Sequence, residues 1–113
     1  MNRGELQKEC LLRIYIAESA VFDGRPVYKR LVELFRKMGF HGCTVSRGMM
    51  GFGHEHTIRT IDVVRLSLDL PVIIDVVDTE EKILSVLPGI EEWVEHGLVT
   101  VQDIRVLRKN PVD

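Results

Sequence analysis

The sequence lacks any long hydrophobic run and contains few cysteines. No stretch approaches the roughly 20 apolar residues that a membrane-spanning helix needs, and the N-terminal residues include no apolar segment of the kind found in signal peptides. The two cysteines, Cys10 and Cys43, are too few for a disulfide framework. We therefore expect a soluble, cytoplasmic protein whose two thiols are free and buried.

Neither sign of charge dominates the chain. Its 15 lysine and arginine residues are balanced by 17 aspartate and glutamate residues, which gives a formal net charge of −2. This balance provides no general attraction to nucleic acid or to anionic membranes. An anionic ligand would therefore need locally placed cations.

Catalytic constellations are also scarce. No nucleophile has an obvious activating base. Asp75 and Asp78 flank the end of a predicted strand, where capping and turn roles are commoner than acid–base catalysis. Acylphosphatases use an asparagine to position water, but the only asparagines here, Asn2 and Asn110, lie at the termini. We therefore do not expect an enzyme.

Hydrophobic periodicity predicts strands and helices within one domain that spans residues 1–113. Residues 1–9 are expected to form a flexible N-terminus, and residues 109–113 a short tail. Apolar residues at helical spacing predict two helices, over residues 26–38 and between residues 78 and 97. Alternating or near-continuous apolar residues predict extended segments at residues 11–17, 43–47, 60–66, 72–77 and 104–107.

Helix-terminus signals mark the two helices. Pro26 suits the first position of the first helix. Asp78 or Thr79 is expected to cap the second helix, Pro88 to kink or split it, and Gly97 to close it. With right-handed crossovers, this order of elements places both helices on one face of an antiparallel sheet. The predicted fold is therefore a ferredoxin-like βαββαβ sandwich of the α+β class, an architecture that hosts many unrelated functions.

Three glycines follow the second predicted strand, at positions 48, 51 and 53. Because glycine has no Cβ, successive backbone N–H groups can face a phosphate or a base edge there. The same glycines would also serve a bulge and a turn. Taken alone, the glycine pattern favours the bulge and turn.

The surrounding residues resemble the PII signalling proteins. Their pattern G-x-x-G-x-T-V, followed by G-F-G at the base of a long loop, is matched by residues 39–45 and by residues 51–53. The similarity extends from Leu11 to Arg108 and is strongest to a bacterial PII-like branch, which shares counterparts of residues 24–26, 47–53 and 69–72. The resemblance implies the PII-like form of the ferredoxin-like fold.

The resemblance also implies a function. PII-like proteins are homotrimers that bind an adenine nucleotide, here ADP, AMP or ATP, in clefts between subunits. They signal that the nucleotide site is occupied through a loop, which here follows Gly51. The resemblance implies a target protein, such as a membrane transporter or an enzyme. The predicted ligand-binding residues are Arg47, Gly48, Met49, Gly51, Phe52 and Gly53 at the loop base, with Arg105 and Arg108 near the C-terminus. An arginine fork is well suited to a phosphate.

Three departures from the PII pattern limit what is implied. Residues 95–100 contain one glycine and no lysine, where PII proteins carry a glycine- and lysine-rich phosphate loop. Residues 54–61 contain no tyrosine, so the tyrosine modification of some PII proteins has no acceptor there. The spacing from Val45 to Gly51 is also one residue longer than the common one, which a bulge would accommodate.

Two alternatives remain at this point. His54 and His56, with His41 and Cys43, offer metal ligands, and copper-tolerance trimers share the fold, although neither pair has the spacing of a closed zinc site. An RNA-binding module would place Tyr15 on the open face of the sheet. The main interpretation involves no nucleic acid.

Overall fold

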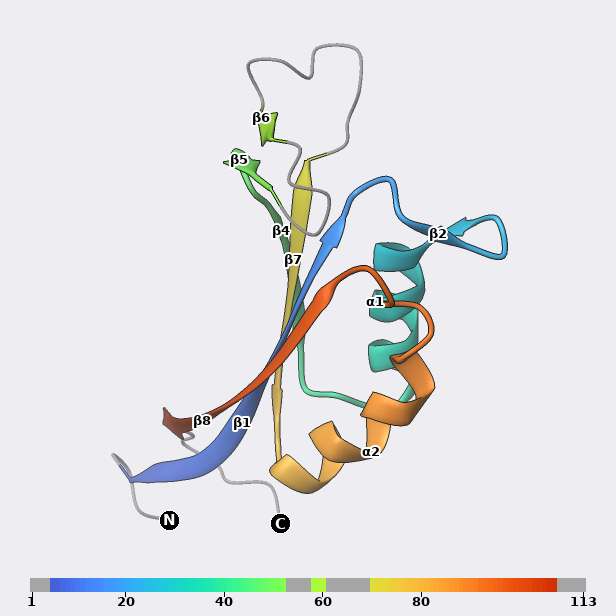
Figure 1. Cartoon of the computed structure of the whole chain (residues 1–113). Helices are drawn as coiled ribbons and strands as arrows, with labels where there is room; N and C mark the ends of the chain where they lie inside the picture. The colour runs from blue at the N-terminus through green and yellow to red at the C-terminus, as the bar shows by residue number, and fades with distance from the viewer. Residues whose placement is uncertain (1–4, 53–57, 61–69, 108–113) are drawn as a thin grey trace.

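The structure, a computed structural model, describes residues 5–52, 58–60 and 70–107 (Figure 1). Its elements are β1 (Leu6–Ala17), β2 (Val21–Phe22), β3 (Arg25–Pro26), α1 (Val27–Lys37), β4 (Cys43–Arg47), β5 (Met50–Gly51), β6 (Arg59–Thr60), β7 (Pro71–Asp78), α2 (Glu80–Ile90) and β8 (Leu98–Leu107). The four long strands form an antiparallel sheet in the order β4-β7-β1-β8. Both helices cover one face of it (Figure 1), which confirms the predicted ferredoxin-like α+β fold. In these ranges no helix is long and apolar enough to cross a membrane.

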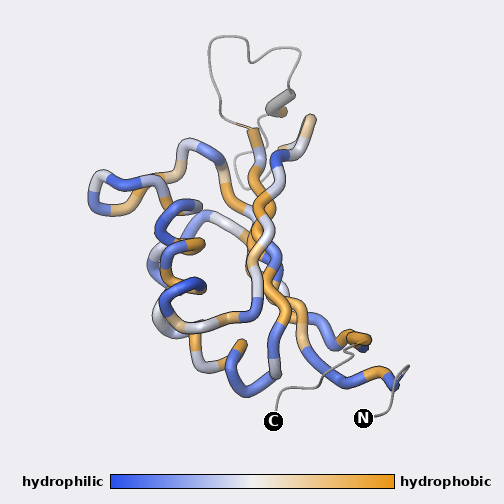
Figure 2. The backbone as a smooth tube through the Cα atoms, turned by 180° about the vertical axis from the view of Figure 1, so that it is seen from behind, coloured by the Kyte–Doolittle hydropathy of each residue, from blue (hydrophilic) through white to orange (hydrophobic). Residues whose placement is uncertain are grey.

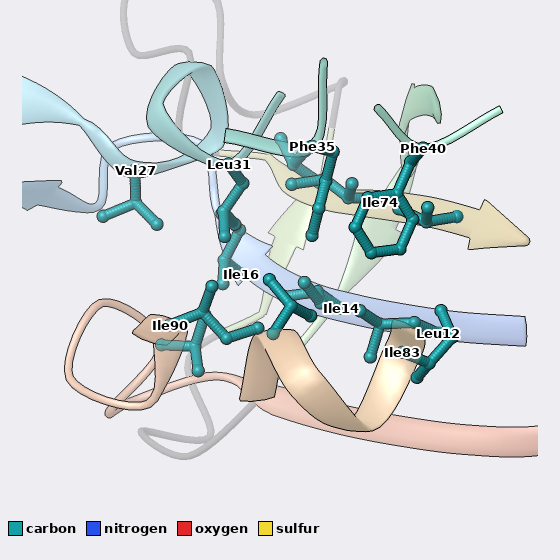
Figure 3. Packing of buried hydrophobic residues seen from close by; sticks show 14 of the residues in the cluster. Leu12, Ile14, Ile16, Val27, Leu31, Phe35, Phe40, Ile74, Ile83 and Ile90 are labelled. Carbon is teal, nitrogen blue, oxygen red and sulfur yellow. The ribbon is translucent and has the colours of Figure 1, made fainter. Parts of the chain in front are cut away.

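The core lies between the sheet and the two helices (Figure 3). Successive side chains of a strand point to opposite faces, so every second residue of β1 and β7 is directed at the helices. Figure 2 shows apolar residues concentrated along these neighbouring strands, whereas apolar and polar residues alternate along the helices. The main buried residues are Leu12, Ile14 and Ile16 of β1, Val72, Ile74 and Val76 of β7, Val27, Leu31 and Phe35 of α1, and Ile83, Val86 and Ile90 of α2.

Two strands, β1 and β8, are longer than predicted. β1 begins at Leu6 and β8 begins at Leu98, so the predicted flexible segment 1–9 and the predicted strand 104–107 have wrong boundaries. The two strands pair with each other in a continuous antiparallel register, from Leu6 opposite Leu107 to Tyr15 opposite Leu98, so the extension of each strand pairs largely with the predicted part of the other. Backbone pairing of this kind does not require alternating apolar residues. Because the added segments contain many polar residues, hydrophobic periodicity did not predict them as strands.

The second helix is shorter than predicted. α2 ends at Ile90, and the residues before Gly97 form turns instead of continuing the helix. Pro88 has no N–H to donate, and its ring crowds the carbonyl of the preceding turn, so the helix continues for only two residues beyond it. Val94 is nevertheless buried, because the turns keep its side chain against the core.

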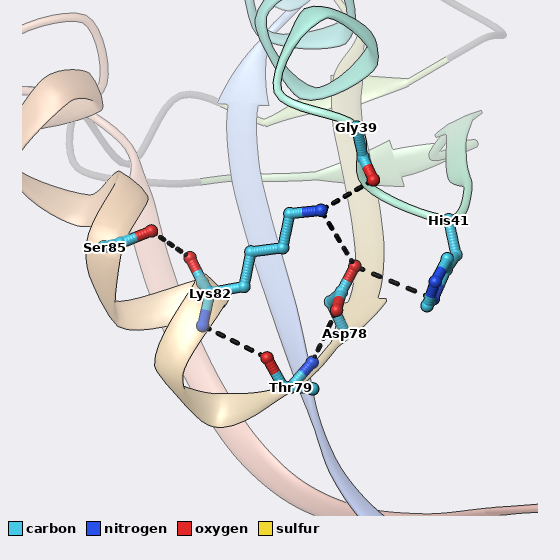
Figure 4. A network of polar contacts seen from close by, with 6 residues as sticks. All are labelled: Gly39, His41, Asp78, Thr79, Lys82 and Ser85. Carbon is cyan, nitrogen blue, oxygen red and sulfur yellow. Dashed lines mark hydrogen bonds and ion pairs between the residues drawn. The ribbon is translucent and has the colours of Figure 1, made fainter. Parts of the chain in front are cut away.

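A polar network holds the start of α2 to the segment that follows α1 (Figure 4). Thr79 is the N-cap of α2, and its Oγ1 accepts a hydrogen bond from the Lys82 amide at 3.2 Å. The Lys82 ammonium donates to the Gly39 carbonyl at 2.6 Å and lies 3.8 Å from Asp78 Oδ2. His41 Nδ1 approaches the same oxygen at 3.7 Å, and the Asp78 side chain is only 4% exposed. Lys82 therefore supplies charge compensation to a buried carboxylate.

Replacing Lys82 tests this role. Lys82→Met keeps the apolar stem but removes the ammonium, so we expect the free energy of unfolding to fall by about 1–3 kcal/mol, the usual cost of an orphaned buried polar group. Urea denaturation followed by the fluorescence of Trp93 measures the change. Lys37→Met on the exposed end of α1 is the control, and its effect should stay within about 0.5 kcal/mol. Equal effects of the two substitutions would contradict the role given to Lys82.

Candidate functional site

The predicted loop base lies at one end of the sheet, where β4 ends and β7 begins. Arg47, the last residue of β4, is opposite Val72 in β7. The next amide, that of Gly48, donates a hydrogen bond to the Pro71 carbonyl at 2.7 Å. The loop base is therefore fixed by backbone pairing to a central strand, and the Gly48 amide is engaged within the protein.

The two ends of the loop meet in a short ladder. β5 and β6 pair with Met50 opposite Thr60 and Gly51 opposite Arg59. Gly53, His54 and His56 lie outside the described residues, as does most of the segment 60–66 that the sequence predicts to be extended. β5 and β6 thus form a ladder of their own, beyond the end of the four-stranded sheet at which β4 ends and β7 begins (Figure 1).

Two of the glycines pack against one proline ring. A Cβ at Gly48 would lie 2.9 Å from Pro71 Cγ, and a Cβ at Gly51 would lie 3.3 Å from the same atom. The first distance is shorter than any that real side chains adopt, so Gly48 is required for the close approach of the loop base to β7. A packing role therefore accounts for Gly48.

Arg47 forms an ion pair that the sequence does not reveal. Its Nη2 lies 2.5 Å from Oε2 of Glu18, and the two side chains are 48% and 13% exposed. Glu18 follows the end of β1, and its amide donates to the Leu70 carbonyl at 3.0 Å. An open depression of about 230 Å³ adjoins the pair and is lined by Glu18, Tyr28, Val45, Ser46, Arg47 and Val72.

The loop base also exposes large apolar side chains. Met49 and Met50 are 72% and 63% exposed, and Phe52 and Ile58 are 63% and 62% exposed. Several exposed apolar residues on one short segment are typical of a contact surface. Met49 and Met50 follow shortly after Arg47, which lines the depression.

Arg105 lies near the C-terminal end of β8, at the end of the sheet away from the loop base. In the sheet, Arg105 pairs with Lys8 of β1. Arg47 pairs with Val72 of β7, and Val72 in turn pairs with Ile16 of β1. Lys8 and Ile16 are eight residues apart on one strand, which corresponds to about 26 Å at roughly 3.3 Å per residue. One subunit therefore does not bring the two predicted phosphate-binding groups together. Arg108 lies outside the described residues.

The open face of the sheet bears on the RNA-binding alternative. Tyr15 lies on this face and is 37% exposed, as that alternative requires. It is, however, the only aromatic residue in the described strands of the four-stranded sheet, whereas RNA recognition motifs stack two or three bases on aromatic rings. Next to it, Arg13 donates two hydrogen bonds to Asp75 at 2.7 and 2.8 Å, which raise the pKa of the guanidinium. The structure offers this alternative little support.

The structure does not test the predicted metal ligands His54 and His56, but it does bring other potential ligands together. His41 approaches Asp78 rather than joining Cys43 in a site, and burial raises the pKa of the Cys43 thiol. Within the described ranges, Cys10 lies in one group of potential ligands, with Glu80 and Asp103, whose donor atoms are within 4.8 Å of one another. Burial, followed by the charge of Asp103, raises the pKa of Cys10, so this thiol stays protonated and donates to Asp103 at 3.7 Å.

Comparison with solved structures defines the class of protein. The chain superposes on CPII, a nitrogen regulatory PII-like protein from Thiomonas intermedia K12 bound to ADP, AMP and bicarbonate, with a TM-score of 0.71 and 23% identity over 92% of each chain. A structure of CPII bound to ADP and bicarbonate gives a TM-score of 0.68 and 26% identity over 92% of this chain and 93% of that chain. The fold is therefore that of the PII-like proteins.

Sequence comparison gives the family. Residues 9–106 match the family model DUF190, described as Uncharacterized ACR, COG1993, and the chain belongs to this family. A UPF0166 protein from Aquifex aeolicus is 38% identical over 100 residues, which cover 88% of this chain and 94% of the relative. The PII-like resemblance of the sequence is thereby confirmed.

Sequence reasoning missed Glu18 and Tyr28 as residues of the depression. Glu18 is 29 residues from Arg47 along the chain, and no local motif links such distant positions. A topological argument would have found it, because the end of β1 and the end of β4 both lie beside the start of β7.

The packing of Gly48 can be tested by adding a single methyl group. We expect Gly48→Ala to lower the free energy of unfolding by about 1–3 kcal/mol, the usual cost of overpacking against a rigid group. Urea denaturation measures the change. Gly42→Ala is the matched control, because a Cβ at Gly42 meets nothing within 4 Å, and its effect should be below about 1 kcal/mol. A neutral Gly48→Ala would show that the loop base moves away from Pro71 without cost.

Proposed function

We infer that this protein is a PII-like regulatory protein that forms a homotrimer and binds an adenine nucleotide between neighbouring subunits. The observation that carries the proposal is the separation of Arg47 from Arg105, at opposite ends of one sheet. Both arginines can contact one ligand only if each comes from a different subunit. The fold shared with CPII, which has been solved with ADP and AMP, supports the choice of ligand.

The open face of the sheet supports self-association. Tyr15 and Leu98 are exposed there and lie opposite each other in the β1–β8 register. The half-buried Ile73 and Val77 lie on the same face in β7, beside the Arg13–Asp75 pair. We propose that other copies of the chain cover these apolar residues, which lie among polar ones on the same face. Covering it would also bury the Arg13–Asp75 pair as a neutral unit.

The local charges favour a ligand with few phosphates. Residues 95–100 contain no lysine. At the loop base, Arg47 is the cationic side chain that the structure describes. We therefore favour AMP or ADP over ATP. The site needs no catalytic group for this role, and we assign the protein a regulatory function without catalysis.

Signalling would use the loop between β5 and β6. Ligand contacts with Gly51, Phe52 and Gly53 would order this loop and change its affinity for a target protein. The exposed side chains of Met49, Met50 and Ile58 at the loop base fit such a contact. Since loops positioned by a rigid scaffold commonly carry binding residues, this arrangement suits a sensor.

Thermal unfolding with a panel of nucleotides tests the ligand. We expect at least one of AMP, ADP, ATP and cyclic AMP, each at millimolar concentration, to raise Tm, because a ligand of the native state stabilises it by mass action. A free concentration about 100 times Kd would add about 2.7 kcal/mol. An unchanged Tm with all four nucleotides would contradict the proposal.

The loop base is tested by Gly53→Val. Added bulk should block close approach of the backbone to the ligand, so the Tm response to the best nucleotide should shrink while the trimer measured by light scattering stays intact. Gly42→Val, at a position with open space around it, is the control and should keep the full response. An undiminished response in Gly53→Val would remove Gly53 from the site.

A further inference from the structure

The Glu18–Arg47 pair lies at the loop base, where the proposed function puts an anionic ligand. Arg47 Nη2 is held by Glu18 Oε2, so part of its donor capacity is used within the subunit. The pair lines the depression beside the loop base. A phosphate that binds Arg47 there must either share the guanidinium with Glu18 or displace the Glu18 carboxylate from it.

The environment of Glu18 makes this competition strong. Its side chain is 13% exposed, and its second oxygen, Oε1, is buried without a hydrogen-bond partner among the described residues. A carboxylate that is poorly hydrated depends on its counter-charge more than an exposed one does. Arg47, at 48% exposure, is the more accessible partner. The guanidinium is therefore accessible to a ligand, whereas the carboxylate is largely withdrawn from solvent.

The backbone of Glu18 connects this pair to the loop. The Glu18 amide donates to the Leu70 carbonyl at 3.0 Å, and the next carbonyl, that of Pro71, accepts from Gly48 at 2.7 Å. The Leu70 end of the loop segment is thus bonded to the turn that carries the carboxylate, and the Gly48 end is bonded to the adjacent residue, Pro71. A change in the partner of Glu18 acts directly on the residues from which the loop departs.

We propose that the Glu18–Arg47 ion pair is an exchangeable contact that controls the nucleotide site, in which a ligand phosphate replaces Glu18 as the partner of Arg47. This proposal rests on the proposed function and deepens it. Glu18 holds Arg47 in the empty site, and its release on binding reports occupancy to the loop base through Leu70. Ligands with a phosphate operate the exchange, whereas adenosine, which has no anionic group, does not.

The proposal predicts which ligands respond to removal of the carboxylate. Glu18→Gln keeps the size of the side chain but removes the charge that competes for Arg47. We expect Kd for AMP and ADP to fall on the order of threefold, consistent with the usual strength of a partly exposed ion pair. Kd for adenosine should not fall. Isothermal titration at low ionic strength without divalent cations measures all three ligands, because screening is then weakest.

Two further variants make the test specific. Glu33→Gln removes the same charge from another arginine pair, Arg25–Glu33 at 2.6 Å, and should leave Kd for ADP unchanged. Glu18→Gln combined with Arg47→Gln should show little gain over Arg47→Gln alone, since the carboxylate then has no arginine to withhold. A comparable gain in the two backgrounds would overturn the exchange.

The outcomes separate this proposal from the proposed function. If the wild-type protein binds ADP and Glu18→Gln binds it equally or more weakly, the exchange is wrong and nucleotide binding stands. An equal gain for adenosine and ADP would also overturn the exchange. If neither the wild-type protein nor Glu18→Gln binds any adenine nucleotide, the proposed function fails and the exchange fails with it.

Discussion

The antiparallel pairing of β1 with both β7 and β8 is the constraint on which the rest of the structure depends. β1 is the longest strand, and its central residues Leu12 and Ile14 are completely buried beneath the helices. Because every second side chain is directed at this face, the register of β1 decides which residues of β7 join the core. The helices then have one apolar surface to cover, and the opposite face of the sheet is left open.

The same pairing decides where the functional groups lie. Arg47 and the loop base are level with the C-terminal end of β1, and Arg105 is level with its N-terminal end. A long central strand therefore separates the two cationic groups, and a site that uses both needs a second copy of the chain. In this proposal the open face, with Tyr15 and the Arg13–Asp75 pair, provides the surface on which copies meet.

Charge compensation recurs at both ends of the sheet. At one end, Lys82 compensates the buried carboxylate of Asp78 and joins α2 to the segment after α1. At the other end, Arg47 compensates Glu18, which is also largely withdrawn from water. Lys82 also donates a hydrogen bond to the Gly39 carbonyl and lies between two elements, which suits a structural role. The Arg47 side chain is half exposed beside a depression, which suits the exchange of its partner for a ligand.

Local patterns determined much of this protein. The apolar spacing of residues 27–38, the alternation of residues 43–47 and the apolar run at 72–77 predict α1, β4 and β7, and the motif ending in Gly53 predicts the family, because each depends on neighbours in sequence. Only the tertiary structure decided the extensions of β1 and β8, the packing of Gly48 on Pro71, and the pairing of Arg47 with Glu18. These contacts join distant segments, and their partners are chosen by strand register, which no local pattern contains.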